Sequence, residues 1–341
     1  MMRRLRMAVA ASALLALTAC GSGSPSGGGG GGAESPAGGA TSTETQTTGG
    51  GELTAIEVGV IPIVDVAPIY LGVEEGIFEK HGLDVTLTLA QGGAAIVPAV
   101  QNGQMDFGFS NVTSLVIGKS RGLPLKLVAT GPQTTGDAED DFAAVMVPED
   151  SDIQETKELE SLRIAVNTLN NINDTVISEA IRQAGGDPEK IQYVEMPFPD
   201  MAAQLDAGNV DAIGAVEPFV TIAEEGGARP IFAQYAEPIP DLSIAGYFTT
   251  DSKIEQDPEL VDQFVAAMKE SQQYATDHPD EAKAILPTYT SLEPEVIENL
   301  TMPRFPQEHD RESLQTVIDL SLENGLIDQE VTLEDLAHEG A

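Results

Sequence analysis

The sequence predicts an α/β fold built from two similar halves, because one pattern occurs twice. The first copy is Ala94–Asn111 and the second is Ala202–Glu217. Each copy has a short helical pattern, then Gly-x-x-Asp, then a short apolar run that ends at a polar residue. A helix that leads into a buried strand is typical of parallel α/β units. Chance is the alternative explanation, because Gly-x-x-Asp is a short pattern.

The polar residue that ends each copy predicts where a ligand binds. Open α/β sheets bind ligands beyond the carboxyl ends of their strands. Asn111 follows the apolar run Phe107–Phe109, and Glu217 follows Ala212–Val216. We therefore expect one of these side chains at a ligand site in each half.

Residues 1–19 have the pattern of a signal peptide. Arg3, Arg4 and Arg6 precede an apolar stretch, 7–17, that is too short to span a bilayer. The segment Leu17–Cys20 resembles a bacterial lipoprotein box, in which the cysteine is lipidated after cleavage. An ordinary secretory signal is the alternative, and the export route, general or twin-arginine, stays open.

Residues 20–53 are predicted to be a lipidated cysteine followed by a flexible tether. The stretch is rich in Gly, Ser and Thr and has almost no large apolar side chain, so it cannot offset its ordering entropy. Cys20 is the only cysteine, which rules out an intramolecular disulfide. The expected location is the extracytoplasmic face of the cell membrane, through this lipid anchor.

The charge of the chain argues against a nucleic-acid partner. Its 341 residues carry 55 acidic and 17 basic side chains, for a formal net charge of −38. Nucleic-acid binding needs a basic face. We therefore expect no nucleic acid among its partners.

The first elements of the body follow in order from the residue pattern. In residues 56–61 apolar side chains alternate with other residues, which predicts a buried strand. A loop over 62–66 follows. Ala67-Pro68 opens a helix, expected to run to Gly82, because proline suits the first turn. Residues 83–89 predict a second strand. Gln91-Gly92-Gly93 then precedes a helix and could present free backbone N–H groups.

Several motifs in this body resemble one family. Residues 68–85, PIYLGVEEGIFEKHGLDV, are followed by Gln91-Gly92-Gly93 and by QNGQMDFGFSN at 101–111. This combination is similar to ABC-transporter solute-binding proteins of the nitrate/sulfonate/taurine type, a group that also contains binders of the pyrimidine precursor of thiamine. The resemblance extends from residue 54 nearly to the C-terminus.

The resemblance implies a two-lobed, periplasmic-binding-protein-like fold of type II, with two crossovers and a ligand cleft between the lobes. Lobe one is expected to be 54–137 plus 251–341, and lobe two 138–250. The implied function is the solute-binding component of an ABC importer, which captures a small polar solute by hinge closure. The implied partners are the solute and the permease subunits, and the protein itself is expected to be a monomer.

Two other functions stay open at this point. One is an enzyme of the thiamine-pyrimidine synthase branch of the same fold, and the other is a ligand sensor for a membrane receptor. The enzymes use a cysteine-rich iron motif, and this chain has no cysteine beyond Cys20. It also has no His/Cys cluster with metal-ligand spacing. We therefore expect no catalysis, no cofactor and no metal.

Polar loops at the expected strand ends supply the candidate ligand-binding residues. The loop 167–175 contains four Asn, two Thr and one Asp right after a predicted strand. Helix capping competes with ligand contact for several of these side chains. The candidates are Asp65, Gly92, Gly93, Asn111, Thr113, Thr168, Asn170, Asn171, Asn173, Asp174 and Glu217.

The same loops favour a neutral or cationic ligand over a strong anion. They contain no Arg or Lys, and they contain Asp65, Asp174 and Glu217. Nearby carboxylates oppose an anion by about 1–4 kcal/mol each at 4 Å. A nitrogen heterocycle such as a thiamine-precursor pyrimidine is one candidate.

Overall fold

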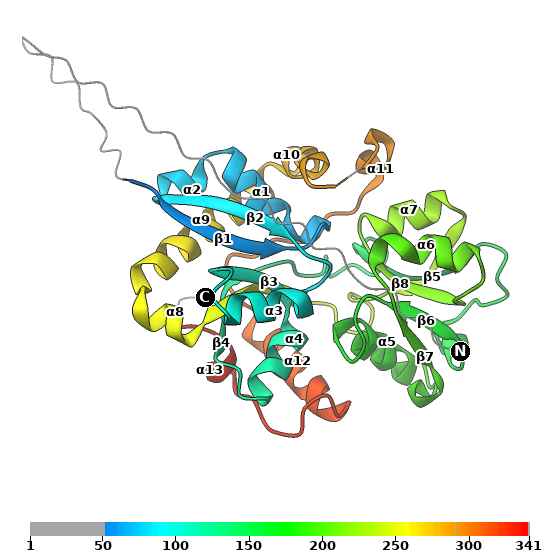
Figure 1. The fold of residues 1–341 in the computed structure, drawn as a ribbon. Coiled ribbons are helices and arrows are strands. Elements are labelled where there is room, and N and C mark those ends of the chain that lie inside the picture. Colours follow the sequence, from blue (N-terminus) through cyan, green and yellow to red (C-terminus); the bar gives the residue numbers. More distant parts are fainter. Residues whose placement is uncertain (1–51, 291, 340–341) are drawn as a thin grey trace, which may run out of the picture. The chain divides into compact units, whose positions relative to one another are not determined.

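The computed structural model describes residues 52–290 and 292–339. The expected signal peptide 1–19, the lipidated Cys20 and the tether up to residue 51 lie outside these residues. The described chain folds around two mixed sheets of five strands each, and Figure 1 shows helices on both faces of each sheet. Among the helices of this part of the chain, none is long and apolar enough to cross a membrane.

The first sheet has the strand order β2-β1-β3-β10-β4, with β10 antiparallel to both of its neighbours. Its strands are β1 (Thr54–Val60), β2 (Leu83–Leu89), β3 (Phe107–Asn111), β4 (Leu125–Thr130) and β10 (Ala245–Thr250). We call this sheet and its helices lobe one.

The second sheet has the order β7-β6-β8-β5-β9, with β5 antiparallel to both of its neighbours. Its strands are β5 (Ala143–Pro148), β6 (Arg163–Val166), β7 (Gln192–Glu195), β8 (Ala212–Val216) and β9 (Ala228–Ala233). We call this sheet and its helices lobe two. In each sheet the antiparallel strand is the one that the chain enters from the other lobe, so the two halves share one topology. The expected α/β fold in two similar halves is therefore confirmed.

Helices of lobe one surround its sheet, and α9 packs on it through a stack of Phe107 and Phe264, whose ring centroids are 3.9 Å apart. The helices are α1 (Ala67–Glu74), α2 (Ile77–Lys80), α3 (Gly93–Gln101), α4 (Val112–Ser120), α8 (Asp251–Gln256), α9 (Pro258–Asp277), α10 (Pro279–Ala284), α11 (Pro294–Asn299), α12 (Arg311–Glu323) and α13 (Leu333–Leu336).

Lobe two has three α-helices, counted over the described residues: α5 (Ile172–Gln183), α6 (Phe198–Asp206) and α7 (Phe219–Glu225). Short 3₁₀ segments complete both lobes: η1 (Val64–Val66), η2 (Thr156–Leu159), η3 (Pro188–Lys190) and η4 (Leu286–Thr288).

The repeated Gly-x-x-Asp pattern has the same structural role in both lobes. Gly103 and Gly208 have φ of 69° and 67°, which only glycine adopts cheaply. The Asp106 carboxylate accepts the backbone N–H of Glu57 at 2.9 Å. In lobe two, Asp211 accepts the N–H of Arg163 at the same distance. Each aspartate thereby ties the entry of one strand to the adjacent strand, so the repeat is not a coincidence of sequence.

One boundary of the expected lobes needs correction. The expected lobe two, 138–250, includes residues 245–250, but β10 pairs with β3 and β4 in the first sheet. The strand is locally indistinguishable from a lobe-two strand, because its membership depends on pairing with residues more than 100 positions away. Lobe two therefore ends in the second crossover, before Ala245.

The helix expected over 67–82 is also corrected. It breaks after Glu74 and resumes at Ile77. Gly76, with φ of 68°, makes the break, because a left-handed residue ends one helix and re-aims the chain.

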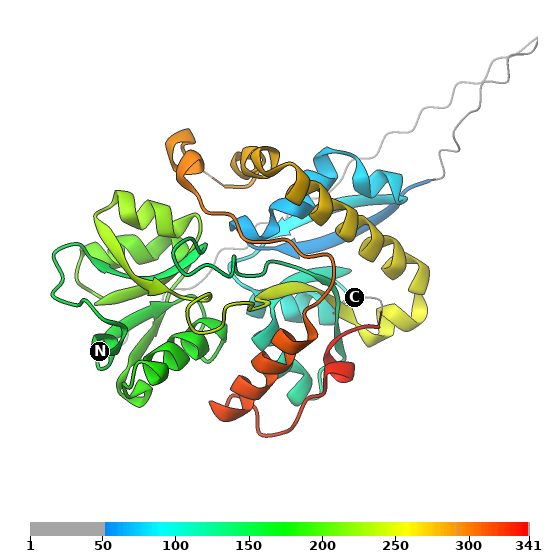
Figure 2. The same ribbon diagram turned by 180° about the vertical axis from the view of Figure 1, so that it is seen from behind.

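Three segments run side by side between the lobes. The first crossover follows β4, the second follows β9, and a C-terminal segment joins α11 to α12 (Figure 2). Gln133 exchanges backbone hydrogen bonds with Arg304 at 2.9 and 3.0 Å, and the N–H of Thr134 donates to Leu242 at 3.0 Å. The Arg304 guanidinium also donates to the Thr134 carbonyl at 2.6 Å and to the Asp241 carboxylate at 2.8 Å. Arg304 thus holds the two crossovers together.

Candidate functional site

A small cavity lies where strands of both sheets end. Its volume is about 30 Å³, which is room for about one or two water molecules. Lobe one and the second crossover contribute Ile61, Ile63, Asp65, Phe109, Asn111, Ile244 and Ala245. Lobe two and the start of the same crossover contribute Asn167, Ile172, Asn173, Phe198, Val216 and Tyr235. The walls are therefore mainly apolar, with a few polar groups that converge from both lobes.

Asp65 is the acidic residue of this lining. Its side chain is 4% exposed, and its Oδ1 has no hydrogen-bond partner among the described residues. Burial raises the pKa of the carboxyl from 3.8 to about 7, against a smaller lowering by a hydrogen bond from its own backbone. Capping does not account for Asp65, because the N-cap of α1 is Val66 and no side chain caps that helix. Asp65 therefore lines the cavity and has a buried oxygen that accepts no hydrogen bond.

Asn111 both caps a helix and lines the cavity. It ends β3, and its Oδ1 accepts the N–H of Ser114 in the first turn of α4 at 2.8 Å. Its Nδ2 makes no hydrogen bond within the described chain, and the residue lines the cavity. The two interpretations that the sequence left open are thus compatible, because the cap uses only the oxygen of the amide.

Asn171 and Asp174 form a capping box at the start of α5. The Asp174 carboxylate accepts the N–H of Asn171 at 2.7 Å and also that of Asn170. Burial raises the pKa of Asp174 to about 6, with these hydrogen bonds opposing the rise. Asn171 also donates from Nδ2 to Ser114 Oγ at 2.8 Å, which links lobe two to α4 of lobe one. Both side chains are engaged in structural bonds and lie outside the cavity lining.

Asn173 organises the polar wall of lobe two. It is 1% exposed, and its Nδ2 donates to Asn167 Oδ1 at 2.8 Å. Its Oδ1 accepts from Gln234 Nε2 at 2.8 Å and from the Tyr235 hydroxyl at 2.6 Å. Asn173 therefore faces the cavity with its hydrogen bonds already satisfied, and it orients Asn167 and Tyr235 there.

Asn167 and Tyr235 are cavity residues that the sequence reasoning did not select. Asn167 directly follows β6, so its place at a strand end was a usable signal. Tyr235 lies in the second crossover, two residues after β9, and no local pattern marks it.

Glu217 lies in the turn before α7, and its side chain hydrogen-bonds to the first turn of that helix. Its carboxylate accepts the N–H of Thr221 at 3.1 Å and the Thr221 hydroxyl at 2.8 Å. A third, longer bond of 3.4 Å comes from the N–H of Thr301 in the C-terminal segment. Burial raises the pKa of Glu217 to about 7. The side chain is not part of the cavity lining, although the Glu217 carbonyl accepts the N–H of Val64, next to Asp65, at 3.3 Å.

The remaining candidates lie around the cavity without lining it. A Cβ on Gly93 would meet Ser110 Oγ at 2.1 Å, so that glycine permits close packing of α3 on β3. A Cβ on Gly92 would meet only Thr168 Oγ1, at 3.7 Å. Thr113 is fully buried in α4, with an unpartnered hydroxyl. Thr168 and Asn170 line a separate groove of about 300 Å³, to which α3 and α4 of lobe one also contribute.

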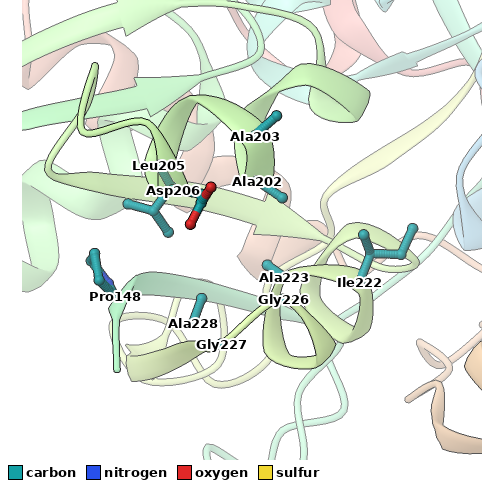
Figure 3. Close-up of a pocket in the computed structure, with 10 residues that line it drawn as sticks. All are labelled: Pro148, Ala202, Ala203, Leu205, Asp206, Ile222, Ala223, Gly226, Gly227 and Ala228. Carbon is teal, nitrogen blue, oxygen red and sulfur yellow. The ribbon is translucent and has the colours of Figure 1, made fainter. Parts of the chain in front are cut away.

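A larger cavity, of about 420 Å³, lies within lobe two between α6, α7 and the edge of the sheet (Figure 3). Its lining is mostly alanine, glycine and leucine, and Asp206 supplies its one charged side chain. No candidate ligand residue lies there. We take the small cavity as the candidate site, because it lies at the strand ends, where open α/β sheets bind ligands, and both lobes contribute to its lining. Within the described residues there is no cluster of His, Cys, Asp and Glu side chains suited to a metal ion.

The architecture is that of a two-lobed periplasmic binding protein of type II. The periplasmic aliphatic sulphonate binding protein SsuA from Escherichia coli has the same fold, with a TM-score of 0.67 and 20% sequence identity. The match covers 82% of this chain and 95% of that protein.

The chain belongs to the NMT1/THI5-like family, whose model matches residues 63–282. This confirms, at the level of family, the resemblance found in the sequence motifs. The chain is 21% identical over 256 residues to a formylaminopyrimidine-binding protein of Halalkalibacterium halodurans, covering 74% of this chain and 72% of the relative. It is 24% identical over 230 residues to the yeast 4-amino-5-hydroxymethyl-2-methylpyrimidine phosphate synthase THI13, covering 63% of this chain and 64% of that enzyme.

Proposed function

We propose that this protein is the extracytoplasmic solute-binding component of an ABC importer of the nitrate/sulfonate/taurine type. The observation that carries the proposal is the cavity between the strand ends, to which both lobes contribute polar side chains. Ligands of open α/β sheets bind at this position. The fold shared with the sulphonate binding protein and the similarity to the formylaminopyrimidine-binding protein support the same function.

Hinge closure is the proposed mechanism of capture. A cavity of about 30 Å³ is too small for an organic solute, so the lobes must separate to admit one. The side-chain bonds between the lobes that would break as they separate include Asn171 to Ser114 at 2.8 Å and Arg182 to Asn324 at 3.1 Å. A solute that contacts both lobes would favour the closed form by its differential binding energy.

Small-angle scattering with and without solute tests this mechanism. We expect the radius of gyration to fall when a solute binds, because the lobes close on it. The matched control is Ser114→Ala, which removes one bond between the lobes and leaves every cavity residue in place. That variant should bind more weakly and still become compact at saturation. An unchanged radius with a solute of proven stoichiometric binding would contradict hinge closure.

An enzyme remains the second candidate, because one relative is a synthase by name. We favour binding, because the cavity lining offers one carboxylate and polar amides rather than a nucleophile paired with a base. Incubating the protein with each solute that it binds, followed by mass spectrometry of the mixture, distinguishes the two. Recovery of the solute unchanged supports binding, and conversion with turnover overturns it.

Membrane attachment through Cys20 and delivery to a permease complete the proposal. Both depend on residues outside the described range or on partners, and each is tested separately. Co-purification with permease subunits supports an importer, whereas co-purification with a receptor of another class would identify a ligand sensor.

A further inference from the structure

The candidate site holds a carboxylate with no cation to balance it. Among the residues that line the cavity, Asp65 is the only acid, and none is Lys or Arg. Its Oδ1 is buried without a hydrogen-bond partner. An unpaired buried charge is costly, and buried polar groups without partners are rare in folded proteins. The arrangement therefore needs a proton or a positively charged partner at that oxygen.

The groups that surround Asp65 do not supply that positive charge. Tyr235, Tyr247 and Tyr289 are the neighbouring ionisable groups, and each has a pKa raised well above 10, mainly by burial and in part by Asp65. All three are therefore neutral phenols. The hydroxyls of Tyr235 and Tyr289 donate elsewhere, to Asn173 Oδ1 at 2.6 Å and to the Ile63 carbonyl at 3.2 Å. The Tyr247 hydroxyl is buried without a partner.

We propose that the cleft binds a small, largely apolar solute through a cationic or N–H-donating nitrogen, which donates to Asp65 Oδ1. This inference rests on the proposed solute-binding function and names the chemical class of the solute. A charge-assisted hydrogen bond to a carboxylate is short and about twice as strong as a neutral one. The solute nitrogen would balance the charge of the Asp65 carboxylate, which a bound proton otherwise neutralises.

The apolar residues of the lining further restrict the chemical class of the solute. Eight of the thirteen lining residues are apolar: Ile61, Ile63, Phe109, Ile172, Phe198, Val216, Ile244 and Ala245. They favour a solute with a hydrocarbon or aromatic body and disfavour a polyamine. Asn111 also lines the cavity from lobe one, and its Nδ2 makes no hydrogen bond within the described residues. A solute with an acceptor near its N–H group, as in an aminopyrimidine, would use both side chains.

The same arrangement disfavours sulfonate and nitrate. Either anion would have to approach an ionised Asp65 in a site without a basic side chain. The solute class is thus distinct from the sulphonate named for the structural relative.

Binding of such a nitrogen should depend on pH through Asp65. The pKa of this carboxyl is about 7 in the unliganded protein. A permanently charged amine must displace the proton below that pH, so its affinity should fall about tenfold between pH 8 and pH 6. Glu217 titrates in the same range, and the pKa of Asp141, a neighbour of Tyr235, is also raised. A comparison with Asp65→Asn separates Asp65 from these two groups.

Calorimetric titration with probes of matched shape tests the proposal. The nitrogen probes are benzylamine, benzamidine and an aminopyrimidine, and the anion probes are benzoate, benzenesulfonate and nitrate. We expect the nitrogen probes to bind and the anions not to. Asp65→Asn should weaken the nitrogen probes about 10- to 100-fold, as expected for loss of a charged hydrogen-bond partner, and should abolish the pH dependence.

Asp206→Asn is the matched control, because it makes the same chemical change at an exposed carboxylate that lines the larger cavity (Figure 3) and not the candidate site. It should leave affinity unchanged. Micromolar binding of benzenesulfonate or nitrate that survives Asp65→Asn overturns the solute class while upholding a binding function. Failure of every nitrogen probe also counts against the class. If, in addition, no solute is released from protein purified from its native membrane, the binding function itself fails.

Discussion

Replacing Asp65 with asparagine should stabilise the solute-free protein at alkaline pH. Burial raises the pKa of this carboxyl from 3.8 to about 7. A rise of this size corresponds to about 4 kcal/mol at a pH above both values, because one pKa unit is worth about 1.4 kcal/mol. The substitution removes this cost. The new amide would itself be buried without full hydrogen bonding, which costs about 1–3 kcal/mol. The net gain in the free energy of unfolding at pH 8 should therefore be about 1–3 kcal/mol.

The sign of the pH dependence follows from proton linkage. Between pH 3.8 and about 7 the folded protein binds the Asp65 proton more tightly than the unfolded chain does. The destabilisation by Asp65 is therefore absent below the lower value, grows as pH rises, and is complete above the higher value. The cost of the amide does not change with pH. The advantage of Asp65→Asn over the wild type should thus be about 2–3 kcal/mol smaller at pH 5 than at pH 8.

Urea unfolding of both proteins at pH 5 and pH 8 measures this difference by linear extrapolation. Other acids with raised pKa values, such as Glu217 and Asp174, contribute equally to both proteins and cancel. Asp206→Asn, an exposed change, should remain within about 0.5 kcal/mol of the wild type at each pH. A stability difference between Asp65→Asn and wild type that is the same at both pH values would refute the reasoning, because it would mean that the carboxyl is not desolvated.

Three further predictions concern the tether, the loop and the helix that surround the site. Cys20→Ala should move the protein from membranes into the soluble fraction, and retention on membranes would refute lipidation. Asn171→Ala should lower the free energy of unfolding by about 1–2 kcal/mol through loss of the α5 cap, as measured by urea unfolding, whereas a stability equal to that of wild type would show that the cap is dispensable. Gly93→Ala should cost about 1–3 kcal/mol in the same assay because its Cβ meets Ser110, whereas Gly92→Ala should be tolerated; equal effects of the two would contradict the packing argument.

The topology could be predicted from sequence because its signals are local. A helix ends just before Gly103 and just before Gly208, and an apolar run follows each glycine a few residues later. Both glycines have the left-handed backbone that the pattern requires. The strand of residues 245–250 is different. Its apolar run is also local, but its partners β3 and β4 lie far away in the sequence. Pattern alone could identify the strand and could not assign it to a sheet.

The candidate site was predicted only in part, because side-chain direction is not encoded in residue type. Asp65 and Asp174 are both acids in loops at strand ends. Asp174 turns back to accept the N–H groups of Asn170 and Asn171, whereas Asp65 has an oxygen with no partner. The difference arises because Asp174 is the third residue of α5 and reaches back to the N–H groups of Asn170 and Asn171, which directly precede the helix. In contrast, α1 begins with Ala67-Pro68, and proline has no N–H to cap.

The two copies of the repeat show how one architecture yields an asymmetric site. Asn111 and Glu217 each follow the strand of a Gly-x-x-Asp unit. Asn111 caps α4, whereas Glu217 precedes the N-cap residue Pro218 and accepts the N–H of Thr221 in the first turn of α7. The amide of Asn111 has a donor left over, and the residue lines the cavity. Both oxygens of Glu217 are occupied by Thr221 and Thr301, so lobe two must take its polar wall from elsewhere, from Asn167 and from Tyr235 on the crossover. Lobe one therefore offers the charge and the free donor to which a solute would bind first, and lobe two offers groups already fixed by Asn173. Under the proposed function, lobe one would select the solute and lobe two would close over it.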